Sequence, residues 1–318
     1  MRVGSLPGMI RGPCIGLVLH PRRDPGAVLD AIGGWAASHG SRLLMRAEDA
    51  ARWDGEVTVV TAPELAARAD AVVSLGGDGT MLGALRLVAR RPVPVLGVNL
   101  GNLGFLVEVQ PEELPDALDR LERSDFTIEE HSGLWLGEDA DEAVAFNDLA
   151  IVRVPGDGVV EATLAVGGQR MGRYRCDGLV ISTSIGSTAY AYSAGGPLVS
   201  PALDAVVVAA LAPMAGISRP LVTSADEPIR LTLQPDSGSP AIEVDGGMLR
   251  RTEPGEALEV RLKPGCGQVV RLDRDRYQRR NQVKLSLLDL PFLPDELREL
   301  AAPGTLPGSP HPPRALEP

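Results

Sequence analysis

The strongest constraint on the fold is the alternation of short apolar segments with helical segments over the first 125 residues. Each apolar segment is a short run between turn residues, which predicts strands at 14–20, 42–45, 70–75 and 93–98. Between the strands, the sequence predicts helices at 25–39, 63–69 and from residue 80 to about 91. Such alternation is typical of an open, mainly parallel α/β sheet. We therefore expect an α/β domain at 1–125, a fold that binds ligands at the carboxyl ends of its strands.

The pattern changes after residue 125. From 126 to 277 the chain contains short β-rich runs, such as TIEEHSGLWLG and EATLAVGG, separated by Gly, Pro, Asp and Ser. These runs predict a second, mostly antiparallel β domain. Residues 203–211 are too apolar and too short to assign by their period. We expect 278–300 to rejoin the first domain, and 303–318, with six prolines and two glycines, to be a disordered tail.

Composition excludes several classes of protein. The net charge of -11 argues against nonspecific nucleic-acid binding. No run reaches the ~18 apolar residues needed to span a membrane. The three cysteines form no CxxC pair, and the four histidines have no metal-ligand spacing, so a zinc cluster is not indicated. We expect a cytoplasmic protein that binds neither membrane nor nucleic acid.

Lysine is scarce, which excludes two kinds of phosphate site. The only lysines are Lys263 and Lys284, and neither lies in a Walker A loop or on an early strand like that of protein kinases. The basic residues of 271–284 alternate with Asp273 and Asp275. We interpret that segment as a solvated face rather than an ATP site.

The first motif, GGDGT at 76–80, lies between a predicted strand and a predicted helix. Ligands bind at this edge of α/β sheets, where glycines allow close approach and a helix N-terminus attracts anions. Asp78 could hold Mg²⁺ or accept a proton from an attacking hydroxyl. A tight turn in which Asp78 only caps the helix is the alternative.

The second motif runs DGLVISTSIGSTAYAYSAGGPLVSP from Asp177 to Pro201. Its two glycine turns are surrounded by hydroxyls and backbone amides that could orient a polar ligand, with Tyr190 available to lie against a ring. Upstream, Asn147 and Asp148 offer an amide and a carboxylate suited to a ribose diol. A polar loop with small-residue packing is the alternative.

GGDGT, FND, DGLVIST…GSTAY…SAGGP and VDGG occur in an order and spacing that resemble the NAD kinase family over about residues 14–290. GGDGT also occurs in lipid kinases and, as GGDGS, in phosphofructokinases, whereas the GSTAY…SAGGP element is specific to NAD kinases. The resemblance implies transfer of the γ-phosphate of ATP to the 2′-hydroxyl of the adenosine ribose of NAD, which gives NADP.

By matching position, the resemblance implies that Asp78 accepts the proton, with Gly79 beside it at the dinucleotide. Asn147 and Asp148 would hold the adenosine side, and Phe105 would wall the adenine pocket. The residues expected along the dinucleotide are Thr188, Ala189, Tyr190, Ala191, Tyr192 and Ser193. The remaining expected contacts are Arg175, Asp177 and Ala215 at the nicotinamide end, together with Asp245 of VDGG.

The chain departs from the family pattern at three places. Ile185 replaces a hydroxyl, Asp148 replaces a glutamate, and Gly247 replaces a glutamine, but Asp78 is retained. The resemblance also implies Mg²⁺ or another divalent cation with ATP, and a homo-oligomer, dimer or tetramer, in which one subunit completes a neighbour's site. A non-catalytic dinucleotide sensor on the same fold is the rival hypothesis, which the intact Asp78 disfavours.

Overall fold

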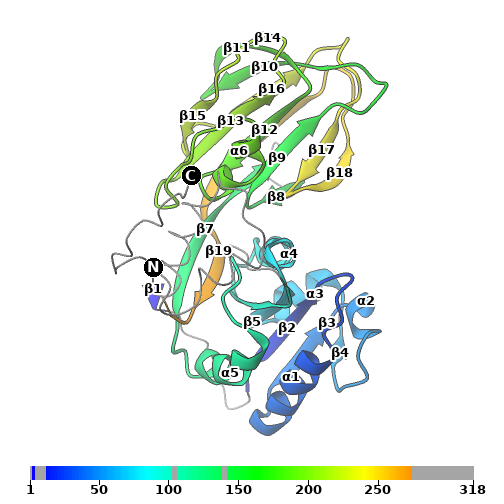
Figure 1. The fold of residues 1–318 in the computed structure, drawn as a ribbon, viewed down its shortest axis with the longest axis vertical. Coiled ribbons are helices and arrows are strands. Elements are labelled where there is room, and N and C mark those ends of the chain that lie inside the picture. Colours follow the sequence, from blue (N-terminus) through cyan, green and yellow to red (C-terminus); the bar gives the residue numbers. More distant parts are fainter. Residues whose placement is uncertain (1, 4–11, 102–105, 138–141, 274–318) are drawn as a thin grey trace, which may run out of the picture.

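The computed structural model describes residues 2–3, 12–101, 106–137 and 142–273. Its N-terminal lobe contains a parallel sheet (Figure 1). In spatial order the strands are β4 (Thr58–Val59), β3 (Arg42–Met45), β2 (Cys14–Leu19), β5 (Ala71–Gly76) and β6 (Pro94–Asn99). Buried side chains of α1 (Gly26–His39) and α5 (Leu114–Glu122) pack on one face. Those of α3 (Ala62–Arg68) and α4 (Asp78–Val88) pack on the other. Short helices α2 (Ala47–Ala50) and η1 (Pro111–Glu113) complete this lobe.

The C-terminal lobe consists of two antiparallel layers whose facing side chains form one apolar core. One layer has the order β15 (Leu221–Ser224), β13 (Ala205–Leu211), β12 (Gly178–Thr183), β9 (Asp148–Val152), β17 (Ala241–Val244), β18 (Gly247–Arg251). The other has the order β14 (Ala215–Gly216), β11 (Gln169–Cys176), β10 (Val160–Val166), β16 (Ile229–Leu233), β19 (Ala257–Arg271). Two short helical segments, η2 (Ile185–Thr188) and α6 (Tyr190–Ser193), lie between β12 and β13.

Two long strands, β7 (Thr127–Leu136) and β19, run through both lobes (Figure 1). They pair antiparallel along most of their length, from Val260 opposite Leu136 to Arg271 opposite Thr127. The first part of β19 also pairs with β16, and its last part pairs parallel to β6. One continuous sheet therefore joins the lobes. Two shorter strands, β1 (Arg2–Val3) and β8 (Ala143–Ala145), pair with β7.

The fold class expected from the sequence is confirmed, with a mainly parallel first lobe and an antiparallel second lobe. Gly40 ends α1 in the left-handed conformation (φ 64°), as its position predicts. The segment left unassigned near 203–211 forms β13, an interior strand. The predicted return of 278–300 and the predicted tail at 303–318 lie outside the described residues. Within the described ranges, no helix is long and apolar enough to cross a membrane.

Candidate functional site

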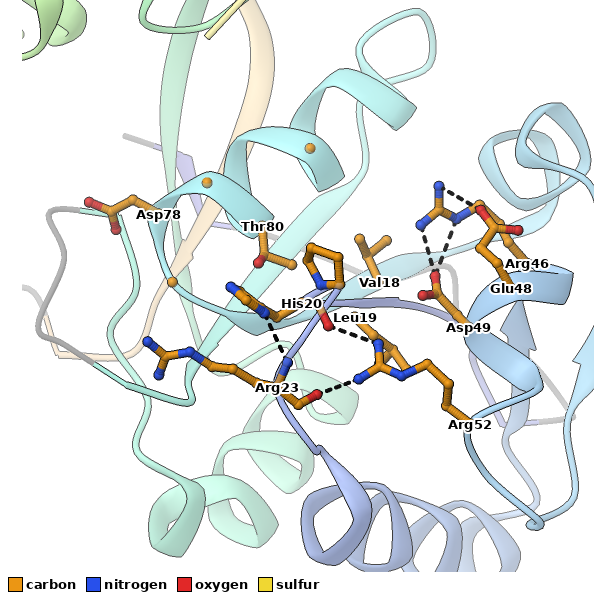
Figure 2. Close-up of a pocket in the computed structure, with 14 residues that line it drawn as sticks. Val18, Leu19, His20, Arg23, Arg46, Glu48, Asp49, Arg52, Asp78 and Thr80 are labelled. Atoms are coloured by element: carbon orange, nitrogen blue, oxygen red, sulfur yellow. Dashed lines mark hydrogen bonds and ion pairs between the residues drawn. The ribbon is translucent and has the colours of Figure 1, made fainter. Parts of the chain in front are cut away.

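The carboxyl ends of β2 and β5 border a cleft of about 790 Å³ (Figure 2). From β2 the chain first adds β3 and β4 on one side, then crosses back to place β5 on the other. Ligands of open α/β sheets bind at such a switch point. The side chains and glycines lining the cleft come from the end of β2, from the segment after β3 and from the start of α4; they include His20, Arg23, Arg46, Asp49, Arg52, Gly77, Asp78, Gly79 and Thr80.

The GGDGT loop closes one side of this cleft. Gly77 is the N-cap of α4, and its carbonyl accepts the first helical hydrogen bonds, from Thr80 and Met81. A Cβ at Gly76 would lie 2.2 Å from Thr80 Oγ1, so this position requires glycine. A Cβ at Gly79 would meet nothing within 4 Å. The loop therefore packs tightly at its first glycine and faces open space beyond it.

Asp78 is the first residue of α4, at the N-terminal end of the helix dipole. Its Oδ1 accepts a hydrogen bond of 2.9 Å from the backbone N–H of Leu106. The carboxylate is thus held beside the cleft by a segment that follows β6.

Three arginines, Arg23, Arg46 and Arg52, line the rest of the cleft together with Glu48 and Asp49. Arg52 donates to the backbone carbonyl of His20 at 2.8 Å and also to that of Arg23. Arg46 pairs with Asp49 at 2.8 Å. Burial and then neighbouring arginines, Arg23 first, lower the pKa of His20, which keeps its ring neutral near pH 7. Guanidinium groups beside a helix N-terminus suit an anion such as a phosphate.

Asp245 joins α4 to the FND segment. Its side chain is fully buried, and its carboxylate accepts backbone hydrogen bonds from Phe146 (3.0 Å), Asn147 (2.7 Å) and Asp148 (3.2 Å). Arg86 of α4 adds an ion pair of 2.6 Å. The residue itself adopts φ 47°, a conformation that persists when surrounding contacts enforce it. Asp245 therefore organises the backbone of the FND segment.

Asp148 lies 4% exposed at the start of β9. Burial raises the pKa of Asp148, nearby Asp245 and Glu243 raise it further, and a hydrogen bond from the backbone N–H of Tyr190 opposes them, giving about 7. A buried carboxyl held among other carboxylates is typical of a functional position.

The GSTAY block lies directly against the FND segment. A Cβ at Gly186 would lie 2.0 Å from the backbone oxygen of Asn147. Thr183 strengthens this approach, since its N–H donates to Asn147 at 2.9 Å and its hydroxyl to Phe146 at 2.7 Å. The structure thus brings the second motif, Asn147 and Asp148 together.

The predicted residues of the block differ in their accessibility. Thr188, Ala189, Tyr190 and Tyr192 are partly exposed, and Ser193 is exposed. Ala191 is fully buried, and its side chain belongs to a small cluster with Ala150 and Val180.

Arg175, Asp177 and Ala215 lie elsewhere in the C-terminal lobe. Arg175 of β11 pairs in register with Ala215 of β14 and forms an ion pair of 3.0 Å with Glu161. Asp177 forms an ion pair of 2.8 Å with Arg153. Four strands, β10, β16, β19 and β6, separate β11 from β5, which carries the GGDGT loop, and Figure 1 draws β11 and β5 well apart, in different lobes. This group therefore does not adjoin Asp78 of the same chain, and Phe105 lies outside the described residues.

The sequence interpretation overlooked two contributions to the site. One is Arg86, a polar residue off the apolar face of α4, which pairs with Asp245. The other is the basic cluster at His20, Arg23 and Arg52, which the HPRR run directly after the first strand could have indicated.

Comparisons with known proteins agree with this geometry. The family model described as the ATP-NAD kinase N-terminal domain matches residues 34–126. The model described as the ATP-NAD kinase C-terminal domain matches residues 146–272. Together they span the GGDGT loop, the FND segment, the GSTAY block and the part of the cleft lined by residues 46–83.

Relatives of similar length carry the same name. The chain is 35% identical to an NAD kinase of Saccharophagus degradans, over 81% of this chain and 90% of that protein. It is 38% identical to an NAD kinase of Gemmatimonas aurantiaca, over 68% of this chain and 77% of that protein.

Two solved structures share the fold. Yeast NADH kinase complexed with NADH superposes with a TM-score of 0.75 at 21% identity, covering 89% of this chain and 90% of that one. An NAD kinase from Archaeoglobus fulgidus in complex with ATP gives a TM-score of 0.67 at 23% identity, covering 86% of this chain and 98% of that one. From the two domain matches and the full-length relatives, the chain belongs to the ATP-NAD kinase family.

Proposed function

We propose that this chain is an NAD kinase that transfers the γ-phosphoryl group of ATP to the 2′-hydroxyl of the adenosine ribose of NAD. The observation that carries the proposal is the position of Asp78, at a helix N-terminus beside a cleft lined by three arginines, in a chain of this family. In the reaction, a bond forms between the 2′-oxygen and the γ-phosphorus. The bond from that phosphorus to the β–γ bridging oxygen breaks, and ADP leaves.

Asp78 is the residue to which we assign proton transfer. As the 2′-hydroxyl attacks, its proton passes to the Asp78 carboxylate, which the N–H of Leu106 orients. A carboxylate is a weak base, with an ordinary pKa of ~4, so alignment of the hydroxyl contributes more than basicity.

The donor phosphates fit the cleft between the GGDGT loop and the arginines. Open space at Gly77 and Gly79 lets a phosphate approach the first N–H groups of α4. A divalent cation would be held mainly by the ATP phosphates, which leaves the Asp78 carboxylate available for the proton. The described residues contain no cluster of three acidic, His or Cys ligands that would hold an ion alone. The cation would offset the negative charge of the transferring group.

NAD is assigned to the surface formed by the FND segment and the GSTAY block. At the adenosine ribose, beside the reacting hydroxyl, the amide of Asn147 donates and accepts hydrogen bonds and the ionised carboxylate of Asp148 accepts them. The partly exposed residues Thr188, Ala189, Tyr190 and Tyr192, with Ser193, extend this surface along the dinucleotide. Ala191 contributes through its backbone, because its methyl group is buried.

The nicotinamide end is assigned to Arg175, Asp177 and Ala215 of a neighbouring subunit. Their separation from Asp78 within one chain supports an arrangement in which two copies complete each site. We therefore infer a homo-oligomer, dimer or tetramer, working in the cytoplasm where NAD and ATP are available.

The test is an assay of NADP formation by the wild type and Asp78→Asn. We expect the variant to lose most turnover, by a factor of 10² or more, while its affinity for NAD changes only a few-fold. A variant with near-normal kcat would remove Asp78 from the mechanism. A wild type that binds NAD without forming NADP would instead identify a dinucleotide sensor.

A further inference from the structure

Arg271 is a buried charge that the reaction does not require directly. It is the last residue of β19, and its side chain is 0% exposed. Its Nε donates to Glu129 of β7 at 2.5 Å, and its Nη1 donates to the backbone carbonyl of Leu106 at 2.7 Å. The expectation of a solvated face at this position is therefore wrong. The side chain faces inward, toward the segment after β6.

Arg271 contacts the segment of residues 106–109, which follows β6. All its residues are buried, and Val109 exchanges backbone hydrogen bonds with β6, through Gly97 and Asn99. At the other end, Leu106 is held at both backbone groups. Its N–H donates to Asp78 at 2.9 Å, and its carbonyl accepts from Arg271.

We propose that Arg271, held by Glu129, is a positioning residue that fixes the Asp78 carboxylate through the backbone of Leu106. This inference rests on the proposed function, because it assigns Asp78 to the transfer step. The contacts form a continuous series from β7 and β19, the strands shared by both lobes, to the first residue of α4.

The Glu129 carboxylate stays charged near neutral pH. Burial raises the pKa of Glu129, but hydrogen bonds from His131 and the charge of Arg271 outweigh it and lower that pKa to about 2. Glu129 therefore stays ionised and keeps the guanidinium in place. A guanidinium can donate to a carboxylate and a carbonyl at once from separate nitrogens, whereas an ammonium carries its three N–H donors on one nitrogen.

The first experiment compares Arg271→Lys with a matched control, Arg120→Lys. Arg120 makes the same kind of fork, with Nε on Asp125 at 2.9 Å and Nη2 on the backbone carbonyl of Leu272 at 2.9 Å. In the described contacts it has no link to Leu106. We expect Arg271→Lys to lower kcat about 10- to 100-fold with KM for NAD within about twofold, because the misplaced group acts only in the transfer step. Arg120→Lys should change neither constant.

A second variant covers the risk that lysine does not fold in a buried site. Glu129→Met, Glu108→Gln and Arg271→Met combined remove the buried arginine together with both buried carboxylates near it, since Glu108 also lies 3.9 Å from Arg271. This triple variant should unfold cooperatively, yet show the same loss in kcat. Amide hydrogen exchange at Leu106 should be faster in Arg271→Lys than in the wild type and in Arg120→Lys, a readout that does not depend on turnover.

The outcomes separate this inference from the proposed function. If the wild type forms NADP and Asp78→Asn does not, a folded Arg271 variant with kcat within twofold of the wild type overturns the positioning role. Unchanged exchange at Leu106 in Arg271→Lys also overturns it. Failure of the wild type to form NADP refutes the proposed function, whereas the exchange result still decides whether Arg271 anchors Leu106.

Discussion

At Asp148, the proposed binding of NAD requires an ionised carboxylate, whereas the stability of the fold favours a protonated one. Its folded pKa of about 7 lies above the ~3.9 of an unfolded aspartate. The folded protein therefore binds an extra proton between these values, and the associated stability is present at low pH and lost as pH rises through 7. Above pH 7, an ionised carboxylate remains buried near Asp245 and Glu243.

We predict that Asp148→Asn is more stable than the wild type at pH 8, and that this gain in stability is much smaller at pH 5. The amide removes the buried charge and can still accept from the N–H of Tyr190. Its advantage in free energy of unfolding should grow by about 2–3 kcal/mol between these pH values. Urea unfolding at both pH values measures this. Asp226→Asn, at an exposed position, is the control and should show no such growth. An equal advantage at both pH values would contradict the raised pKa.

Asp148→Asn should also impair catalysis while it stabilises the fold. Loss of the ionised acceptor should weaken NAD use by about 1–3 kcal/mol, read as a fall in kcat/KM. A stabilising substitution that lowers activity is the expected sign of a functional carboxylate.

At the scale of elements, two glycines in the two motifs have different functions. Gly186 allows η2 to lie against the end of the FND segment, because any Cβ would collide with Asn147. Gly79, in the first turn of α4, has open space at its Cβ position. Packing requires the first glycine, whereas the open space beside the second is where we propose that a phosphate binds.

We predict that Gly186→Ala lowers the free energy of unfolding by about 1–3 kcal/mol through forced displacement. Gly79→Ala should keep or raise stability by about 0.4–1 kcal/mol, because alanine suits the helix. Gly79→Ala should nevertheless raise KM for ATP, since its methyl group occupies the space assigned to a phosphate. Thermal unfolding and steady-state kinetics on both variants check this. A Gly79 variant with unchanged kinetics would exclude close approach of a ligand there.

Most elements could be predicted from local pattern, and the exceptions have physical reasons. β13 is buried over most of its length, so it shows no alternation from which to read its period. α5 has Leu114, Leu118 and Leu121 at helical spacing and a proline in its first turn, so its sequence does carry the pattern of an amphipathic helix. For Arg271, the sequence shows a basic run but not the register with β7, which turns that side chain inward.

The site itself was predictable only in part. The order of the motifs predicts Asp78, Asn147, Asp148 and the GSTAY block as site residues. The structure places the last three side by side. The Arg86–Asp245 ion pair joins residues 159 positions apart, so no local pattern reveals it.

At the scale of the whole molecule, the proposed sharing of sites between subunits can be tested by mixing variants. Asp78→Asn lacks the proton acceptor, and Asp177→Ala lacks the group assigned to a neighbour's nicotinamide end. In a mixed dimer, one of the two sites would combine Asp78 of one subunit with Asp177 of the other. Random mixing makes half the dimers mixed, so about a quarter of all sites should regain wild-type composition.

Co-expression of the two variants should therefore give activity above the average of the separate preparations. Asp78→Asn co-expressed with wild type controls for simple dilution. Activity that stays at the average would show that Asp177 serves its own chain or none.

The sheet that runs through both lobes limits how this enzyme can be dissected. The boundary between the two matched sequence regions, near residues 126–146, falls within and just after β7. A fragment ending there would lose β19 and leave the inner strand β6 as an open edge, with its backbone groups available to other chains. Such a fragment is a candidate for aggregation rather than an independent nucleotide-binding module. Although family models match the sequence as two consecutive regions, the shared sheet makes the two lobes one folding unit for any truncation or domain exchange.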